Sequence, residues 1–131
     1  MQYYSLGDLN QHDFILFGDA DKFWNLLERY FYIVPKDIID RLRSDCAFLM
    51  MDRVRNAYFI NKRSVIVFHD SLYSENEDTQ ADKILHEIAH YVLDHYDEGE
   101  DHKYDKEAND LKNQWIKDRQ EHLKTQKGIN S

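Results

Sequence analysis

The chain of 131 residues contains little cysteine, no excess of basic residues and no long apolar run. Its one cysteine, Cys46, cannot form a disulfide within the chain, and its apolar neighbours predict a buried thiol. The net charge is −8 and no segment is rich in Lys or Arg, which disfavours direct binding to DNA or RNA. No apolar run approaches a membrane span, and the first residues lack the basic and apolar parts of a signal peptide. These absences predict a soluble cytoplasmic protein without a membrane partner.

Apolar and aromatic residues are abundant, in contrast. They make up 42% of the chain and include nine Tyr, seven Phe and two Trp, so a folded core is expected rather than disorder. The length suits one domain, and the sequence contains no repeat, linker or low-complexity segment.

The first half of the chain predicts two helices and a small sheet. Residues 14–17 form an apolar run that could be a strand or a packed arm. Asp19 or Asp21 can cap a helix that carries apolar residues at helical spacing as far as Val34, and Pro35 suits the first turn of a second helix. Three apolar runs follow, separated by short polar turns, and predict an antiparallel meander over residues 46–51, 57–60 and 64–68.

Two helices are predicted in the second half. Thr79 is a plausible cap for the first of them. The second begins near Lys103, carries an apolar stripe, and is expected to fray beyond about Lys124. The stripe consists of Tyr104, Ala108, Leu111 and Trp115.

The pattern H-E-x-x-H, formed by His86, Glu87 and His90, is the strongest functional signal. Residues four apart lie one turn above each other on a helix, so His86 and His90 can present two imidazoles to one metal ion. Glu87 is near enough to reach a water molecule on that ion. At 100° per residue, the two histidines lie opposite an apolar face. This face contains Ala81, Ile84, Leu85, Ile88 and Val92.

A catalytic zinc site usually has three protein ligands, and the third is not decided by the motif. On a continuous helix His95 points about 180° away from His86, which favours a role in packing or in contacting a metal ligand rather than the metal. His102 lies in a charged connection and stays a candidate. Glu107 is the stronger candidate, because it borders the apolar stripe of the last helix and a carboxylate there needs a positive partner. Asp105 points about 100° from the stripe and is expected to be solvated.

The run from His86 to Leu93, followed by Lys106-Glu107-Ala108-Asn109, is similar to the ImmA/IrrE family of metallopeptidase domains. That family pairs H-E-L-G-H-x-x-L with a downstream E-A-N, and the resemblance covers roughly residues 46–115. It implies that His86 and His90 are zinc ligands, that Glu87 is the catalytic carboxylate and that Glu107 is the third ligand of one Zn²⁺ per chain. Asn109 matches a position to which we assign no role, and His95 matches a histidine without a clear metal role.

The resemblance also implies a fold and a size. We expect an α+β fold, with a small antiparallel sheet of about three strands packed against the H-E-x-x-H helix and a following glutamate-bearing helix, after N-terminal helices. Residues 1–131 would form a single minimal zincin-like domain with its core at about 20–124. Ala89 replaces the usual glycine of the motif, and the sequence after Asn109 departs from the family pattern. Within these 131 residues we expect no counterpart of the longer C-terminal portion or of the helix-turn-helix domain found in that family.

The resemblance therefore implies a zinc metallopeptidase that cleaves a protein or peptide, such as a regulatory repressor. The strand over residues 64–68 would be the edge onto which an extended peptide could add. Tyr91, Tyr104 and His102 are candidate oxyanion donors, between which the sequence does not choose. One alternative is an inactive zinc-binding module that sequesters a protein partner. Another is a protein that acts by contact alone, with incidental histidines. The oligomeric state stays open.

Overall fold

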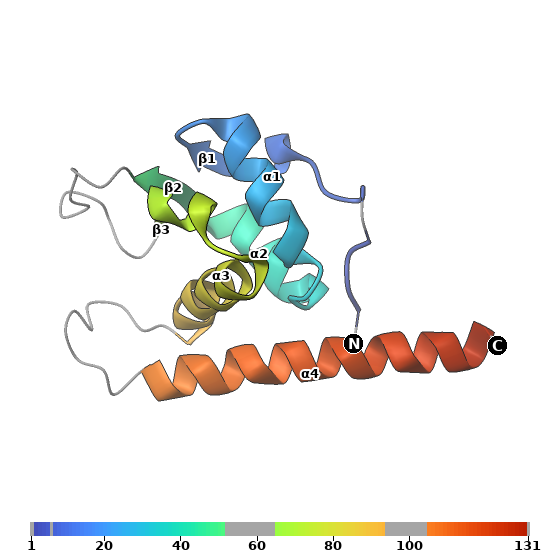
Figure 1. Ribbon diagram of the computed structural model, residues 1–131. Helices are drawn as coiled ribbons and strands as arrows, with labels where there is room; N and C mark the ends of the chain where they lie inside the picture. Colours follow the sequence, from blue (N-terminus) through green and yellow to red (C-terminus); the bar gives the residue numbers. More distant parts are fainter. Residues whose placement is uncertain (1, 6, 52–64, 94–104, 131) are drawn as a thin grey trace.

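Helices and a small sheet form a mixed α+β fold in this protein (Figure 1). The computed structural model describes residues 2–5, 7–51, 65–93 and 105–130, and the side chains of this range up to residue 125. The elements in chain order are η1 (Gln11–Asp13), β1 (Ile15–Phe17), α1 (Ala20–Phe31), α2 (Lys36–Asp45), β2 (Ala47–Met51), β3 (Val65–His69), η2 (Asp70–Ser74), α3 (Glu77–Val92) and α4 (Asp105–Asn130).

The described sheet is parallel, so the predicted antiparallel meander is wrong. Its order is β1-β2-β3, and Leu16, Phe48 and Ile66 are partners across the three strands. Parallel neighbours need a crossover connection of about a dozen residues or more. The helices α1 and α2 connect β1 to β2, and residues 52–64 provide enough chain to connect β2 to β3. The predicted strand over 57–60 lies outside the described residues, and the apolar run before Gly18 supplies β1 instead.

The turn from β1 into α1 confirms one of the two predicted caps. Gly18 has a φ of +121°, a backbone conformation that L side chains rarely adopt. The Asp19 side chain then accepts a hydrogen bond from the backbone N–H of Lys22 and caps α1. Pro35 occupies the cap position of α2, as its fixed φ favours at a helix start.

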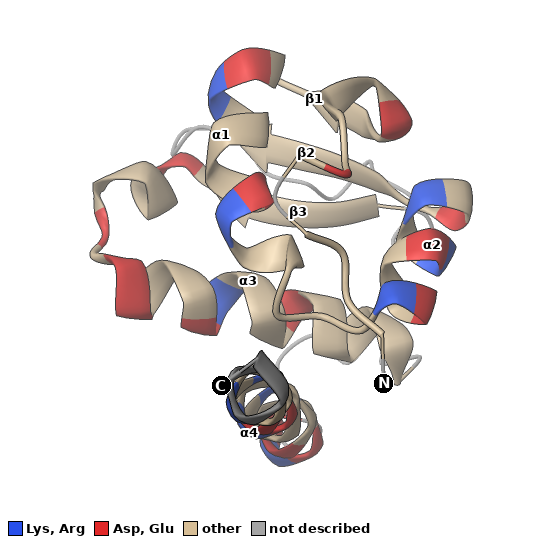
Figure 2. Ribbon diagram, turned by 90° about the vertical axis from the view of Figure 1, so that its right-hand side faces the viewer, with Lys and Arg blue, Asp and Glu red and all other residues tan. Residues whose placement is uncertain are grey.

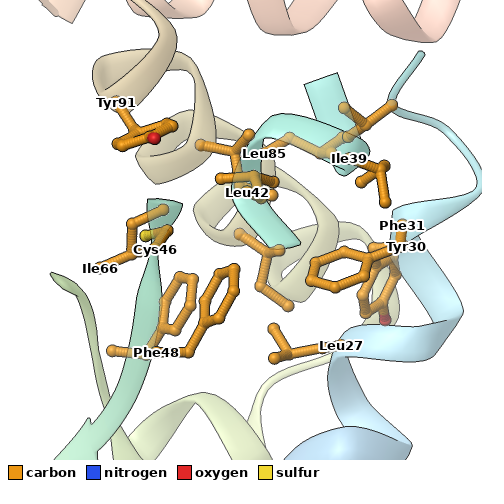
Figure 3. Close-up of a cluster of buried hydrophobic side chains, with 14 of the residues drawn as sticks. Leu27, Tyr30, Phe31, Ile39, Leu42, Cys46, Phe48, Ile66, Leu85 and Tyr91 are labelled. Carbon is orange, nitrogen blue, oxygen red and sulfur yellow. The ribbon is translucent and has the colours of Figure 1, made fainter. Parts of the chain in front are cut away.

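The core lies between the sheet and the helices that cover one of its faces (Figures 1 and 2). Phe48, Ile66 and Phe68 alternate along β2 and β3 and contribute buried side chains to it. Cys46 is also buried, as predicted, and its place among apolar side chains is visible in Figure 3. Burial raises the pKa of the Cys46 thiol to about 12. This thiol is therefore a core group without thiolate character at neutral pH.

Helix α3 begins three residues earlier than Thr79 would place it. Asn76 is the cap, and its side chain accepts a hydrogen bond from the backbone N–H of Thr79. The predicted apolar face is confirmed, since Ile84, Leu85 and Ile88 are fully buried. One turn before them, the side chain of Gln80 forms a buried polar link between α1, η2 and α3. It accepts a hydrogen bond from the Tyr30 hydroxyl at 2.7 Å and donates one to the Leu72 carbonyl at 3.0 Å.

Replacing Tyr30 by phenylalanine should destabilise the fold by about 1–3 kcal/mol, because it leaves the amide oxygen of buried Gln80 without its partner. The free energy of unfolding in urea measures the change. Tyr32→Phe is the matched control: its hydroxyl donates to the half-buried carboxylate of Glu28 at 3.2 Å, which water can hydrate after the change. Equal destabilisation by the two variants would contradict a special role for Gln80.

Helix α4 lies alongside α3 on the side away from the sheet (Figures 1 and 2). Its backbone stays helical as far as Asn130, so the predicted fraying beyond Lys124 is wrong. Ala108, Lys112 and Trp115 are buried residues of this helix. Among the described residues, no helix combines the length and apolar character needed to cross a membrane.

Candidate metal centre

A pocket of about 500 Å³ lies where β3, η2, α3 and α4 meet. Two residues of the H-E-x-x-H pattern, His86 and Glu87, line it, together with Asp105 and Asn109 from the start of α4. The remaining lining residues come from the end of β3, from η2 and from the middle of α3, and are Val67, Phe68, His69, Ser71, Leu72, Asp82 and Lys83. The pocket therefore joins the motif to the outer strand of the described sheet.

Three potential ligand atoms converge beside this pocket. The Nε2 atoms of His86 and His90 are 2.9 Å apart. The Asp105 Oδ1 atom lies 3.2 Å from the Nε2 of His90 and 3.4 Å from the Nε2 of His86. The side chains are 10% exposed for His90, 20% for His86 and 43% for Asp105, so the group is open mainly on the aspartate side.

This group fits a metal ion. Two ligand atoms on a tetrahedral zinc with bonds of about 2.1 Å lie about 3.4 Å apart. The separations in the group, 2.9–3.4 Å, are close to that value. Two imidazole nitrogens and one carboxylate oxygen are also a donor set that zinc and related divalent ions accept. His86, His90 and Asp105 could therefore hold one ion, and three protein ligands would leave a coordination position for water.

Asn109 has a clear place in this geometry, although no role could be assigned to it from the sequence. Its side-chain Oδ1 is 2.9 Å from the Nδ1 atom of His86. A hydrogen bond from Nδ1–H to this oxygen places the proton of neutral His86 on Nδ1 and leaves the lone pair on Nε2. Asn109 therefore orients the ring as an outer partner commonly orients a metal-binding histidine.

Lys112 extends this hydrogen-bond network from Asn109 to a further residue of α3. Its ammonium group donates to the Asn109 Oδ1 at 3.3 Å and also to the Oδ1 of Asp82. The Lys112 side chain is only 8% exposed, whereas that of Asp82 is 58% exposed. A buried lysine is costly unless it is paired, and here both partners lie at the edge of the pocket.

Helix geometry separates the two acidic residues at the start of α4. Asp105 and Asn109 are four residues apart and share the face that meets α3, whereas Glu107 lies about 200° around the helix from Asp105. The Glu107 side chain is exposed and is not part of the converging group. The expectation that Asp105 is solvated and points away is wrong, and a ligand role for Glu107 stays a prediction.

The other predicted site residues lie elsewhere. Tyr91 is buried in the core beside Cys46 (Figure 3), with the Arg41 guanidinium 5.1 Å from its ring centre. Burial raises the pKa of its hydroxyl, and Tyr91 does not line the pocket. The structure therefore does not support its predicted role as an oxyanion donor. His95, His102 and Tyr104 lie outside the described residues.

Sequence reasoning missed His69, which ends β3 and lines the pocket. Its Nδ1 atom accepts a hydrogen bond from the backbone N–H of Ser71 at 3.2 Å, so the neutral ring carries its proton on Nε2. The available signal in the sequence was a histidine directly after an apolar run. Parallel strands end at the same edge of a sheet, so a residue at the end of one strand can lie beside a site at that edge. That signal depends on knowing that the strands are parallel.

No protein-family model matches the chain, and neither does any curated protein or solved structure with which it was compared. The resemblance to the ImmA/IrrE family therefore rests on the two motifs alone and stays a prediction.

Proposed function

We propose that the protein is a zinc-dependent hydrolase that cleaves peptide bonds. The observation that carries the proposal is the convergence of the two motif histidines and a carboxylate beside a pocket that Glu87 also lines. A structural zinc site is usually closed by four protein ligands, whereas the group formed by the described residues offers three. In this proposal Asp105 is the third ligand, and Glu107 is the alternative that the resemblance implies.

The chemistry requires a base beside the metal position. Zinc bound there would lower the pKa of a coordinated water and polarise the carbonyl of a substrate. Glu87 follows His86 directly on α3 and is half-buried at the pocket wall, within reach of a water held there. It would take the proton of the attacking water and deliver it to the leaving amine. His86 and His90 act only as ligands, held by their helix one turn apart.

The pocket also offers a place for an extended peptide. Strand β3 is the last strand in the described sheet order, and Val67, Phe68 and His69 line the pocket. A peptide that adds to such a strand gains main-chain hydrogen bonds and lies next to the motif. His69 would replace Tyr91 as the candidate donor to the developing oxyanion, through its Nε2–H. A folded regulatory protein would have to present an extended segment to this edge.

One observation favours the alternative of a zinc-binding module that captures a protein without cleaving it. Ile15 and Phe17 on the edge strand β1 are 57% and 52% exposed. Two large apolar side chains on the exposed face of a strand are typical of a protein contact surface. Capture of a protein that stays intact, with the same affinity for wild type and Glu87→Gln, would support this alternative.

Removing the metal should abolish peptide cleavage, and adding zinc back should restore it. The wild-type chain is treated with a chelator, dialysed and reloaded with one equivalent of Zn²⁺, and each form is incubated with a diverse peptide mixture. Mass spectrometry then counts new termini, and incorporation of ¹⁸O from labelled water identifies hydrolysis. Cleavage that persists in the metal-free protein, or its absence in fully loaded protein across the mixture, would contradict the proposal.

A further inference from the structure

We propose that Lys112 is a positioning residue that holds His86 in its metal-binding tautomer by fixing the orientation of the Asn109 amide. This inference rests on the proposed metal site and adds a residue that the sequence motifs do not include. Lys112 lies two turns after Asp105 on α4 and contacts neither ligand histidine in the hydrogen bonds described for it. Its effect would pass through Asn109.

The lysine ammonium group is only a hydrogen-bond donor. The group of Asn109 that faces the Lys112 ammonium must therefore be its carbonyl oxygen and not its NH₂. The same oxygen lies 2.9 Å from the Nδ1 of His86, so that ring nitrogen must be the donor. The lone pair of the neutral ring is then on Nε2, the atom that faces His90 and Asp105.

Of the two described partners of the Asn109 side chain, the His86 ring can accept either orientation of the amide, and only Lys112 requires its oxygen. In the reversed orientation the NH₂ would donate to the Nδ1 of His86, and the proton of the ring would then reside on Nε2. A protonated Nε2 cannot bind a metal. Lys112 would therefore remove a competing state, and its loss should lower metal affinity although it does not touch the metal.

Simple electrostatics predicts the opposite sign, which makes the inference testable. Removing a positive charge near a cation site should strengthen binding. Asp82 already pairs with Lys112, and this carboxylate would remain at the pocket after the lysine is removed. A charge effect alone therefore predicts tighter zinc binding in Lys112→Met, whereas the tautomer effect predicts weaker binding.

The first test compares zinc dissociation constants in a competition assay with a chelating dye. Lys112→Met, which keeps the apolar stem, should weaken binding by about tenfold, at the low end of the range for outer partners of metal ligands. Lys83→Met is the matched control, because it removes a lysine from the same pocket, where Lys83 pairs with Glu75 at 3.1 Å. It should change the constant by no more than about twofold, as expected for an exposed, screened charge.

The second test places Lys112→Met in an Asn109→Asp background. A carboxylate has no NH₂ and accepts from Nδ1 in either orientation, so it makes the lysine unnecessary. The loss caused by Lys112→Met should therefore nearly vanish in this background. A loss of the same size in both backgrounds, or unchanged or tighter binding in Lys112→Met itself, would overturn the inference.

The third test needs no metal. Long-range ¹H–¹⁵N spectra of the metal-free protein, at a pH where the imidazoles are neutral, distinguish a proton on Nδ1 from one on Nε2. Wild-type His86 should carry it on Nδ1, whereas in Lys112→Met most molecules should carry it on Nε2, because a tenfold loss of affinity corresponds to about one tenth of the molecules in the binding-competent tautomer. An unchanged tautomer in Lys112→Met would overturn the inference even if the protein binds zinc. The expected change would support it even if no peptide is cleaved.

Discussion

Replacing Glu87 by glutamine should lower the rate of peptide hydrolysis by about 10²–10⁴-fold, the usual contribution of a general acid–base group. Zinc content should stay at about one ion per chain, because Glu87 is not part of the converging ligand group. Glutamine keeps the size of the side chain but cannot accept a proton from water. The measurement is the hydrolysis rate of zinc-loaded wild type and variant on one peptide identified in the mixture assay.

A control for this change is Glu77→Gln, which alters an exposed glutamate in the first turn of the same helix. It should leave the hydrolysis rate within about twofold of wild type, since exposed single charges contribute little. Full activity in a zinc-loaded Glu87→Gln protein would show that hydrolysis does not use this carboxylate. Another group would then have to accept the proton of the attacking water.

Replacing Asp105 by alanine should raise the zinc dissociation constant by at least about a hundredfold, more than the loss of an outer partner causes. Its Oδ1 lies 3.2 Å and 3.4 Å from the two histidine Nε2 atoms, so it is the described carboxylate placed to complete the site. The measurement is the same competition titration with the chelating dye. The rate of hydrolysis should fall in proportion to zinc occupancy, because the proposed reaction needs the bound ion.

Glu107→Ala is the matched control for Asp105→Ala, because it removes the same charge two residues away on the exposed side of α4. It should change zinc affinity by no more than about threefold. The opposite pattern, with a large loss in Glu107→Ala and little change in Asp105→Ala, would mean that α4 is rotated when metal binds. It would also support the motif assignment that the family resemblance implies.

The helix that carries the motif could be predicted well from the sequence. The 3.6-residue spacing of Ile84, Leu85 and Ile88 identified the buried face of α3, and the two histidines necessarily lay opposite it. The antiparallel sheet was predicted wrongly because strand direction depends on the path of the connections. An apolar run of a few residues carries no information about that path.

The carboxylate that joins the two histidines could not be predicted from the sequence, for a related reason. The apolar stripe chosen for α4 included Leu111 and Tyr104 and placed Glu107 at its border. Ala108, Leu111 and Trp115 of that stripe do contact the core, but the buried face also includes Lys112 with half-buried Asp105 and Asn109, which meet the polar site. Periodicity of apolar residues cannot locate a helix face whose contacts are polar. Only the position of α4 against α3 reveals it.

A crystal structure of zinc-loaded wild-type protein, with anomalous diffraction data collected on both sides of the zinc absorption edge, would locate the bound ion. We expect one strong anomalous peak per chain at bonding distance from the Nε2 atoms of His86 and His90 and from the carboxylate of Asp105, with Glu87 close by. Zinc bound at other residues, or no zinc peak at this group in fully loaded protein, would contradict the proposed site.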